Sequence, residues 1–474
     1  MSIRPVRVAM LLHKSVEFDS RVRREASALA RAGHDVTVLE LAAVPAGARL
    51  DGFARRSVAP PPWLRRRLPF HLYRIAFLAS FVKGVVRVRP DVVHAHDAAM
   101  LAPGIVGARL SGAALVYDSH ELASSVPYRE RAWAWFVAAI ERLVVPRCAA
   151  VITVSDSIAA RLQARYRLAR TPTVVRNVSA LTPGGRGALR ARLGIARETP
   201  LVLHQGAPAP ARGCEVLIDA VAQLPGVHLA FLGDPEPGYG AALQMLVVQR
   251  GLSDRVALLA SVALEDLLAH TAEADVGVTL LQDTCENHRL ALPNKLFEYI
   301  AAGVPVIAAA LPETRRLVER YGVGWCVPPA DAAALAAALR VALHGPPDPL
   351  LRERLARAAA ELCWTVEQER LLALYARLSG PGDHKPMGAQ HPHARERAIQ
   401  APGPPGDGRR EGDRAHTQLP APERAAQLAE PDQAGVTVGG GHARLPDRDR
   451  AAAGEHATSL AESAADVLAR AHGR

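Results

Sequence analysis

The stretch from Asn287 to Ala309, N-H-R-L-A-L-P-N-K-L-F-E-Y-I-A-A-G-V-P-V-I-A-A, constrains the fold more than any other part of this sequence. It predicts a loop that ends at Pro293, then a helix over residues 295–302 with Asn294 as its N-cap. Gly303 ends the helix at a position that often needs positive φ, and a buried strand follows. The stretch therefore predicts one helix–strand unit of an α/β fold.

The start of this predicted helix has the chemistry of an anion site. Its first N–H groups have no partner within the helix, and Lys295 lies in the first turn, which suits a diphosphate. Glu298 lies about one turn further along on the same side as Asn294, where it can accept hydrogen bonds from a sugar. A phosphate site beside a sugar site suggests a nucleotide-sugar, and an ordinary solvated helix start is the alternative.

Composition limits the classes of protein. The chain has 474 residues and a formal net charge of +10, which allows about two to three domains and favours anionic partners. Aromatic residues make up only 4%, and we find no basic motif interleaved with aromatics, so nucleic acid is not an expected partner. The five cysteines form no C-x-x-C pair and no H-E-x-x-H motif is present, so we expect a reducing compartment and no metal.

No targeting segment or membrane span is evident. The longest apolar stretch, residues 75–88, is interrupted by Lys83 and is shorter than a bilayer requires. Residues 63–88 combine Trp63 and neighbouring arginines with Tyr73, Phe77 and Phe81 at four-residue spacing. An interfacial helix on an anionic membrane and a core-facing helix both fit this pattern. We expect a cytoplasmic protein, with contact to the inner face of the membrane as one alternative.

The first half of the chain places polar residues at the predicted carboxyl ends of parallel strands. A strand over residues 6–12, a helix over 19–31 and a strand over 36–39 form a βαβ unit. Two later strands end in H-A-H-D at residues 94–97 and in Y-D-S-H-E at residues 117–121. Open α/β sheets bind ligands at this edge, so we expect these clusters to form one wall of a cleft.

These motifs resemble one family. P-N-K-L-F-E-Y and A-G-x-P-V, with D-x-R at residues 19–21, H-A-H-D and Y-D-S-H-E, are similar to retaining GT-B glycosyltransferases of the family-4 type, over most of residues 6–345. The resemblance implies an α/β fold with two Rossmann-like parallel-sheet domains facing across a cleft. It implies an acceptor domain at 1–182, a nucleotide-sugar domain at 183–345 and a helix at 346–379 that returns to the first domain. The low hydrophobicity of residues 380–474 predicts a disordered tail.

The resemblance also implies roles for individual residues. The histidine that matches His120 lies beside the transferring sugar carbon, and Asp97 faces acceptor or donor hydroxyls. No metal or other cofactor is expected, because Arg212, Lys295 and helix-terminus N–H groups would stabilise the leaving diphosphate. The expected sites are catalytic (His120, Asp97), donor-binding (Gly206, Arg212, Gly213, Gly233, Asn294, Lys295, Glu298) and acceptor-side (Asp19, Arg21, His96, Glu121).

The sequence departs from the family pattern in three places. The loop after the first strand has no Gly-Gly pair, and Ala207 stands where the arginine of a G-R…K-G pattern is found. Leu290 replaces the first Glu of Glu-x7-Glu, so Glu286 or Asn287 would have to contact the sugar. Because Ala207 replaces that arginine, Lys295 or Arg289 would have to supply positive charge for a diphosphate.

The predicted function is sugar transfer from a nucleotide-sugar to a glycan, lipid-linked or small-molecule acceptor, with retention of configuration, in a role such as polysaccharide biosynthesis. A nucleotide-sugar epimerase on the same fold is one alternative. A catalytically silent sugar-nucleotide-binding module, suggested by Ala207 and Leu290, is the other.

Overall fold

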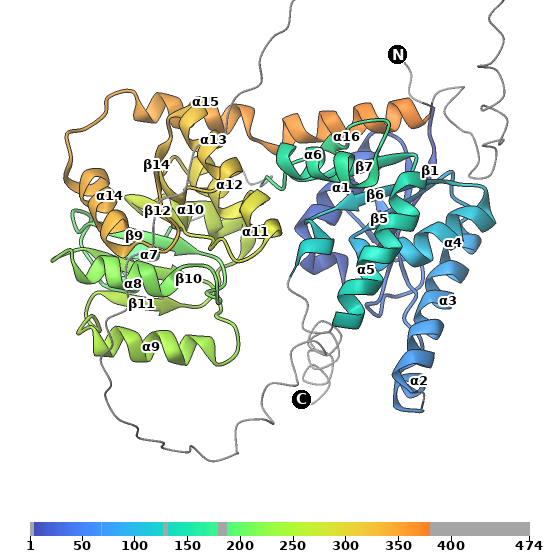
Figure 1. Ribbon diagram of the computed structural model, residues 1–474, viewed down its shortest axis with the longest axis horizontal. Helices are drawn as coiled ribbons and strands as arrows, with labels where there is room; N and C mark the ends of the chain where they lie inside the picture. Colours follow the sequence, from blue (N-terminus) through green and yellow to red (C-terminus); the bar gives the residue numbers. More distant parts are fainter. Residues whose placement is uncertain (1–3, 68, 127–130, 179–186, 380–474) are drawn as a thin grey trace, which may run out of the picture. The chain divides into compact units, whose positions relative to one another are not determined.

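The computed structural model describes residues 4–67, 69–126, 131–178 and 187–379. The predicted disordered tail at 380–474 lies outside these residues, and so does the predicted domain boundary between residues 182 and 183. The described chain contains two separate parallel sheets, each with its own helices (Figure 1). The predicted α/β fold with two parallel-sheet domains is confirmed.

The first sheet has eight strands in the order β3-β4-β2-β1-β5-β6-β7-β8, and every neighbouring pair except β3 and β4 is parallel. Its strands are β1 (Arg7–Leu12), β2 (Asp35–Glu40), β3 (Arg49–Leu50), β4 (Phe53–Ser57), β5 (Val92–His96), β6 (Ala114–Ser119), β7 (Ala150–Thr153) and β8 (Thr173–Val174). The helices are α1 (Ser20–Arg31), α2 (Pro62–Arg67), α3 (Phe70–Val88), α4 (Leu101–Ser111), α5 (Arg131–Val144) and α6 (Asp156–Tyr166), with short 3₁₀ turns η1 (Val16–Phe18), η2 (Ala98–Met100), η3 (Ala123–Ser125) and η4 (Val145–Arg147).

The second sheet has six strands in the order β11-β10-β9-β12-β13-β14, all parallel. Its strands are β9 (Leu201–Gln205), β10 (His228–Leu232), β11 (Val256–Leu259), β12 (Val276–Thr279), β13 (Val306–Ala309) and β14 (Gly324–Val327). The helices are α7 (Leu189–Leu193), α8 (Cys214–Ala222), α9 (Tyr239–Gln249), α10 (Leu267–Thr271), α11 (Glu286–Leu290), α12 (Asn294–Ala301), α13 (Pro312–Tyr321) and α14 (Ala332–His344), with the 3₁₀ turn η5 (Leu264–Asp266). Central strands such as β9 and β12 are buried along their whole length, because helices cover both faces of a parallel sheet.

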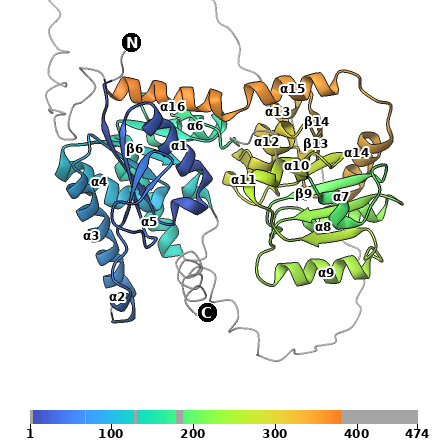
Figure 2. The same ribbon diagram turned by 180° about the vertical axis from the view of Figure 1, so that it is seen from behind.

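The last two helices connect the two sheets. The sequence predicted one helical stretch over residues 350–378, and the structure divides it into α15 (Leu351–Glu361) and α16 (Trp364–Leu378). α15 packs against α12, whereas α16 packs against α1 and β8 of the first sheet. Figures 1 and 2 show α16 running along α1 and α6. α16 is therefore the part of this segment that packs on elements of the first sheet.

The stretch at residues 287–309 folds largely as predicted, with one correction. Leu296 and Tyr299 are fully buried, and Gly303 has φ 73° just after the helix. Asn294, however, is not the N-cap: it is the first residue of α12, Pro293 occupies the cap position, and no side chain caps the helix. Proline offers no side-chain acceptor, so the first N–H groups of α12 have no side-chain partner.

Candidate active site

The carboxyl ends of β5 and β6 bring the two predicted polar clusters together. The strands are parallel and in register, with His96 opposite Asp118. Asp97 and His120 are the first residues after β5 and β6, so their side chains emerge at one edge of the sheet. His96 and Asp118 have no exposed surface, whereas the His120 side chain is 18% exposed. The Asp97 side chain is 24% exposed, so His120 and Asp97 are the members of this cluster that a substrate can reach.

His120 lies between two carboxylates. Its Nδ1 is 3.3 Å from Asp97 Oδ1, and its Nε2 is 3.0 Å from Asp118 Oδ2. Burial lowers the pKa of His120, but the two carboxylates outweigh burial and raise it to about 9. The imidazole is therefore charged at neutral pH, donates a hydrogen bond from Nε2 to Asp118 and forms an ion pair with Asp97 through Nδ1. Asp97 has φ 63°, a left-handed conformation that is uncommon for a non-glycine residue and is often found at functional sites.

Arg21 of α1 holds the Asp118 carboxylate in place from the protein interior. Its guanidinium donates two hydrogen bonds of 2.9 Å to the Asp118 carboxylate and one of 2.7 Å to the Val175 carbonyl. Burial raises the pKa of Asp118, but Arg21 and His120 hold it well below its usual range. Arg21 was predicted to lie on the acceptor side, but it is only 2% exposed. It can therefore act on a substrate only indirectly, through Asp118 and His120.

The other predicted acceptor-side residues have different environments. Asp19 accepts a 3.0 Å hydrogen bond from the Val22 N–H at the start of α1 and pairs with Lys14. Burial raises the pKa of Asp19, yet the charges of His120 and Lys14 lower it to about 2. Glu121 is exposed and accepts a hydrogen bond from Asn287 Nδ2 at 3.3 Å.

One group of side chains has the composition of a metal site. Each member offers a ligand atom within 4.8 Å of the others: Glu25, His94, His96 and Asp118. Arg21 already binds both oxygens of Asp118 and lies 3.1 Å from Glu25 Oε1. The guanidinium therefore supplies the positive charge that this cluster would otherwise take from a cation.

On the second sheet, Lys295 and Arg212 lie at the end of β9. Lys295 is 8% exposed, and its Nζ is 3.4 Å from His204 Nε2. Burial, and after it the positive charge of Arg212, lower the pKa of Lys295 to about 7. A Cβ at Gly206 would lie 3.7 Å from Nζ, so the β9–α8 loop passes next to this amine. The side chains of Lys295 and Arg212, the β9–α8 loop at Gly206 and the uncapped start of α12 therefore lie close together.

Glu298 is held by β9. It accepts a hydrogen bond from the Gln205 side chain, and burial raises its pKa. Tyr299 Oη accepts a 2.8 Å hydrogen bond from the Gln205 N–H and lies 3.0 Å from the Leu203 carbonyl. His204 and Gln205 were missed in the sequence analysis. They are polar residues at the carboxyl end of the buried strand β9, and the polar residues at the end of β5 were found by that same signal.

Gly213 and Gly233 are required for close packing within the protein. Gly213 has φ 68°, and a Cβ there would lie 2.6 Å from Leu280 Cβ. A Cβ at Gly233 would lie 2.6 Å from the Gly206 carbonyl carbon. A side chain at Gly233 would therefore collide with the β9–α8 loop, and the donor-binding role of Gly233 stays a prediction.

The residues expected to replace the missing family residues, Glu286, Asn287 and Arg289, have hydrogen-bond or ion-pair partners within the protein. Glu286 accepts a 2.9 Å hydrogen bond from Ser125 Oγ and pairs with Arg161, and Asn287 Oδ1 accepts one of 2.8 Å from the Leu122 N–H. Arg289 is 56% exposed and pairs with Asp283. Of the two cations considered for the donor phosphates, Lys295 is therefore the one beside Arg212.

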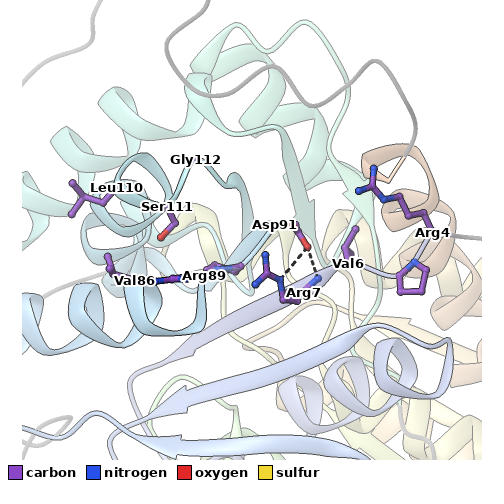
Figure 3. Close-up of a pocket in the computed structure, with 11 residues that line it drawn as sticks. Arg4, Val6, Arg7, Val86, Arg89, Asp91, Leu110, Ser111 and Gly112 are labelled. Carbon is purple, nitrogen blue, oxygen red and sulfur yellow. Dashed lines mark hydrogen bonds and ion pairs between the residues drawn. The ribbon is translucent and has the colours of Figure 1, made fainter.

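A hollow of 450 Å³ lies elsewhere. Figure 3 shows it at the amino ends of β1 and β5, where Arg7 donates to the Asp91 carboxylate. Arg89 and the exposed Leu110 also line it. Parallel α/β sheets bind ligands at the opposite, carboxyl edge, so this hollow is separate from the site around His120 and Asp97.

The chain is similar to known glycosyltransferases. Residues 20–178 match the family described as Glycosyltransferase Family 4, and residues 199–344 match Glycosyl transferases group 1. D-inositol 3-phosphate glycosyltransferase of Mycolicibacterium smegmatis is 28% identical over 378 residues, covering 75% of this chain and 85% of that protein.

Solved structures share the fold. Sucrose-phosphate synthase from Thermosynechococcus elongatus superposes with a TM-score of 0.62 at 21% identity, covering 79% of this chain and 99% of the other. Anabaena Alr3699/HepE in complex with UDP gives 0.61 at 18% identity, covering 78% and 99%, and its UDP-glucose complex gives 0.59 at 18% identity, covering 79% and 98%. The two parallel-sheet domains are therefore those of a GT-B protein. The chain belongs to the GT-B glycosyltransferases, with a family 4 region followed by a group 1 region.

Proposed function

We propose that the protein transfers a sugar from a nucleotide-sugar to an acceptor hydroxyl, with retention of anomeric configuration. The observation that supports this most strongly is the pair formed by Lys295 and Arg212 beside the uncapped start of α12. A buried lysine with a lowered pKa becomes fully charged when an anion lies next to it, and a diphosphate is such an anion. The UDP and UDP-glucose complexes of Alr3699/HepE agree with this donor class.

In the proposed mechanism the bond between the sugar carbon and the diphosphate oxygen breaks as the acceptor oxygen attacks from the same face. Lys295, Arg212 and the α12 N–H groups stabilise the charge that develops on the departing diphosphate, without a bound metal. The acceptor proton passes to the departing phosphate oxygen. His120, charged and held by Asp97 and Asp118, orients the reacting sugar.

Glu298 would accept hydrogen bonds from the hydroxyls of the nucleoside ribose or the sugar. Burial raises its pKa, and the Gln205 side chain orients its carboxylate. The alternatives of an epimerase and of a silent binding module gain no support from the comparisons, because both matched families are glycosyltransferases. Free epimerised sugar nucleotide without acceptor would identify an epimerase, and a lack of sugar-nucleotide hydrolysis over hours would identify a silent module.

Calorimetric binding of UDP-sugars tests the donor site. Arg212→Ala and Glu298→Ala should each weaken binding about tenfold or more, because each removes a charged hydrogen-bonding group from the site. Arg250→Ala is the matched control, since Arg250 is a surface arginine of the same sheet domain that pairs with Asp219. Unchanged affinity in both site variants would refute the assignment.

We also propose that the acceptor is presented at an anionic membrane surface. Among the described residues, no helix is long and apolar enough to cross a bilayer. Large apolar side chains are nevertheless exposed on the helices next to the first sheet: Trp63 on α2, Ile75 on α3 and Trp135 on α5. Arg74 of α3 lies 4.4 Å from the centre of the Trp133 ring of α5, so α3 and α5 are in contact.

Vesicle sedimentation tests this surface. The protein should bind vesicles that contain anionic lipid more tightly than neutral ones, and Trp135→Ser should weaken that binding several-fold. Met245→Ser is the control, because Met245 is also a well-exposed apolar residue, 62% against 75% for Trp135, but lies on α9 of the other domain. Equal binding of wild type and Trp135→Ser would contradict membrane contact at this face.

A further inference from the structure

Helix α16 inserts one aromatic side chain beneath the histidine cluster. Tyr375 is fully buried, and its hydroxyl lies 3.0 Å from His94 Nδ1. The two residues are 281 positions apart in the chain, and α16 follows both sheets in the sequence. A residue outside both sheets therefore contacts the strand that leads to Asp97.

His94 is connected to His120 through His96. The rings of His94 and His96 stack at 4.3 Å between centroids. His96 Nδ1 lies 3.3 Å from Asp118 Oδ2, the same oxygen that His120 Nε2 approaches at 3.0 Å. The same Nδ1 also lies 3.3 Å from His120 Nε2, so His96, His120 and Asp118 meet through these three atoms. His96 Nε2 is buried and has no hydrogen-bond partner among the described residues, so the contacts of His96 in this cluster are made through Nδ1.

The Tyr375 hydroxyl contacts one ring nitrogen of His94, and Glu25 faces the other. His94 Nε2 faces Glu25 Oε2 at 3.9 Å, and Glu25 Oε1 lies 3.1 Å from the Arg21 guanidinium. A hydroxyl that donates to Nδ1 leaves the proton on Nε2, directed at the carboxylate. Without the hydroxyl the proton can move to Nδ1, and a bare Nε2 would then face Glu25 in a buried environment.

A second contact of α16 supports the same cluster. Glu367 is fully buried and accepts hydrogen bonds from the Arg176 N–H at 2.9 Å and from its guanidinium at 3.2 Å. The preceding carbonyl, that of Val175, accepts the 2.7 Å hydrogen bond from Arg21. The helix thus supports Asp118 from two directions, through the histidines and through Arg21.

We propose that Tyr375 is a positioning residue for sugar transfer: its hydroxyl fixes the tautomer and ring plane of His94, and through His96 and Asp118 it fixes the orientation of His120. This inference rests on the proposed glycosyltransferase function. Tyr375 touches no substrate itself. It acts as an outer hydrogen-bonding partner acts on a metal-ligating histidine, by orienting the ring that does the work.

Tyr375→Phe removes the hydroxyl and keeps the ring. It should lower kcat about tenfold and leave the KM for the nucleotide-sugar within about twofold, since a small displacement of a reacting group costs rate more than binding. Tyr321→Phe is the matched control, because it removes a comparable hydrogen bond, 2.8 Å to Glu361, from the α13–α15 contact. That variant should retain wild-type kcat.

A double-mutant cycle separates positioning from general stability. His94→Asn should lower kcat by a similar factor, and adding Tyr375→Phe to it should lower kcat little further, since the hydroxyl acts through His94. Wild-type kcat in Tyr375→Phe, or losses that multiply in the double variant, would overturn the proposal.

Nitrogen NMR of the histidine rings gives a readout that does not depend on turnover. His94 should appear as the Nε2–H tautomer in the wild type and shift toward Nδ1–H in Tyr375→Phe, while Tyr321→Phe leaves it unchanged. An unchanged His94 tautomer in Tyr375→Phe would also overturn the proposal. If the wild type transferred no sugar, the proposed function would fail, and the tautomer result would still test the hydrogen-bond chain.

Discussion

His120 and Lys295 show how neighbouring groups determine the charge of a residue. His120 lies between two carboxylates, which raise its pKa to about 9. Lys295 lies beside Arg212 and His204, and burial together with Arg212 lowers its pKa to about 7. The first site already contains its counter-charges, whereas the second gains its counter-charge when an anion binds. Each residue leads to a test.

Donor binding should take up a proton. Lys295 is largely neutral at pH 8.5 in the free protein, and a diphosphate favours its charged form. Affinity should therefore fall as pH rises above 7, by up to about tenfold per pH unit. Calorimetry at pH 8.5 in two buffers with different protonation enthalpies measures the uptake. Lys295→Met should abolish it, and Lys83→Met, at an exposed lysine on α3, should not. Heats that do not depend on the buffer in the wild type would exclude this mechanism.

His120 should remain charged well above neutral pH. Its folded-state pKa is about 9, above the 6.5 of an unperturbed histidine, so its contribution to stability is complete below pH 6.5 and disappears as pH rises through 9. Ring-proton NMR should show a titration near pH 9. Asp118→Asn should move it downward, because one of the two carboxylates is lost. A midpoint near 6.5 in the wild type would contradict the ion-pair geometry.

At the level of elements, α12 is positioned by a strand glycine. Tyr299 lies against β12 at Gly277, where a Cβ would be 2.4 Å from the tyrosine ring. The same tyrosine hydrogen-bonds to Gln205 at the end of β9. The contacts of Tyr299 with Gly277 and Gln205 set the distance between α12 and the sheet. The start of α12 lies next to the Gly206 loop as a result. A small change in the core should therefore affect the donor site.

Gly277→Ala tests this dependence. The added methyl group cannot fit without moving Tyr299, so we expect a loss of about 1–3 kcal/mol in unfolding free energy, as for other overpacked cores. Sugar-nucleotide affinity should fall as well, although Gly277 contacts no ligand. Urea unfolding and calorimetry measure the two effects. Wild-type values for both would show that α12 is positioned in another way.

At the level of the whole molecule, α15 and α16 join the two sheets. α15 packs on α12, and α16 packs on α1 and β8, so the segment spans from the donor helix to the elements that hold Arg21. Glu367 is one polar attachment of α16 beside the Tyr375–His94 contact, and it is fully buried against Arg176 and also paired with Arg370. Glu367, Arg176 and Arg370 form a charge network, and removing Glu367 would leave the two arginines without this partner.

Glu367→Ala should therefore destabilise the protein by about 3 kcal/mol and speed hydrogen exchange in α16. Glu369→Ala is the matched control, since Glu369 is an exposed glutamate on the same helix. Denaturant unfolding and amide exchange of residues 364–378 provide the measurement. Equal exchange rates in the two variants would show that the Glu367 network does not hold α16 in place.

The sequence by itself determined the elements and the chemistry available to them. Alternating buried strands and amphipathic helices predicted the α/β class, since periodicity is a local property of the chain. Gly303 marked the end of α12 for the same reason, because its positive φ depends on the residue itself. The polar clusters at residues 94–97 and 117–121 were found because parallel strands end at one edge of a sheet.

Only the tertiary structure decided which of these groups act together. Arg21 and Asp118 are 97 positions apart, and nothing local indicates that this arginine is buried under a carboxylate. The cap of α12, the packing role of Gly233, the engagement of Glu286 and the contact of Tyr375 with His94 likewise depend on neighbours that are distant in sequence. Hydrogen bonds and pKa shifts are set by what lies within a few ångströms in space, and a linear pattern does not specify those distances.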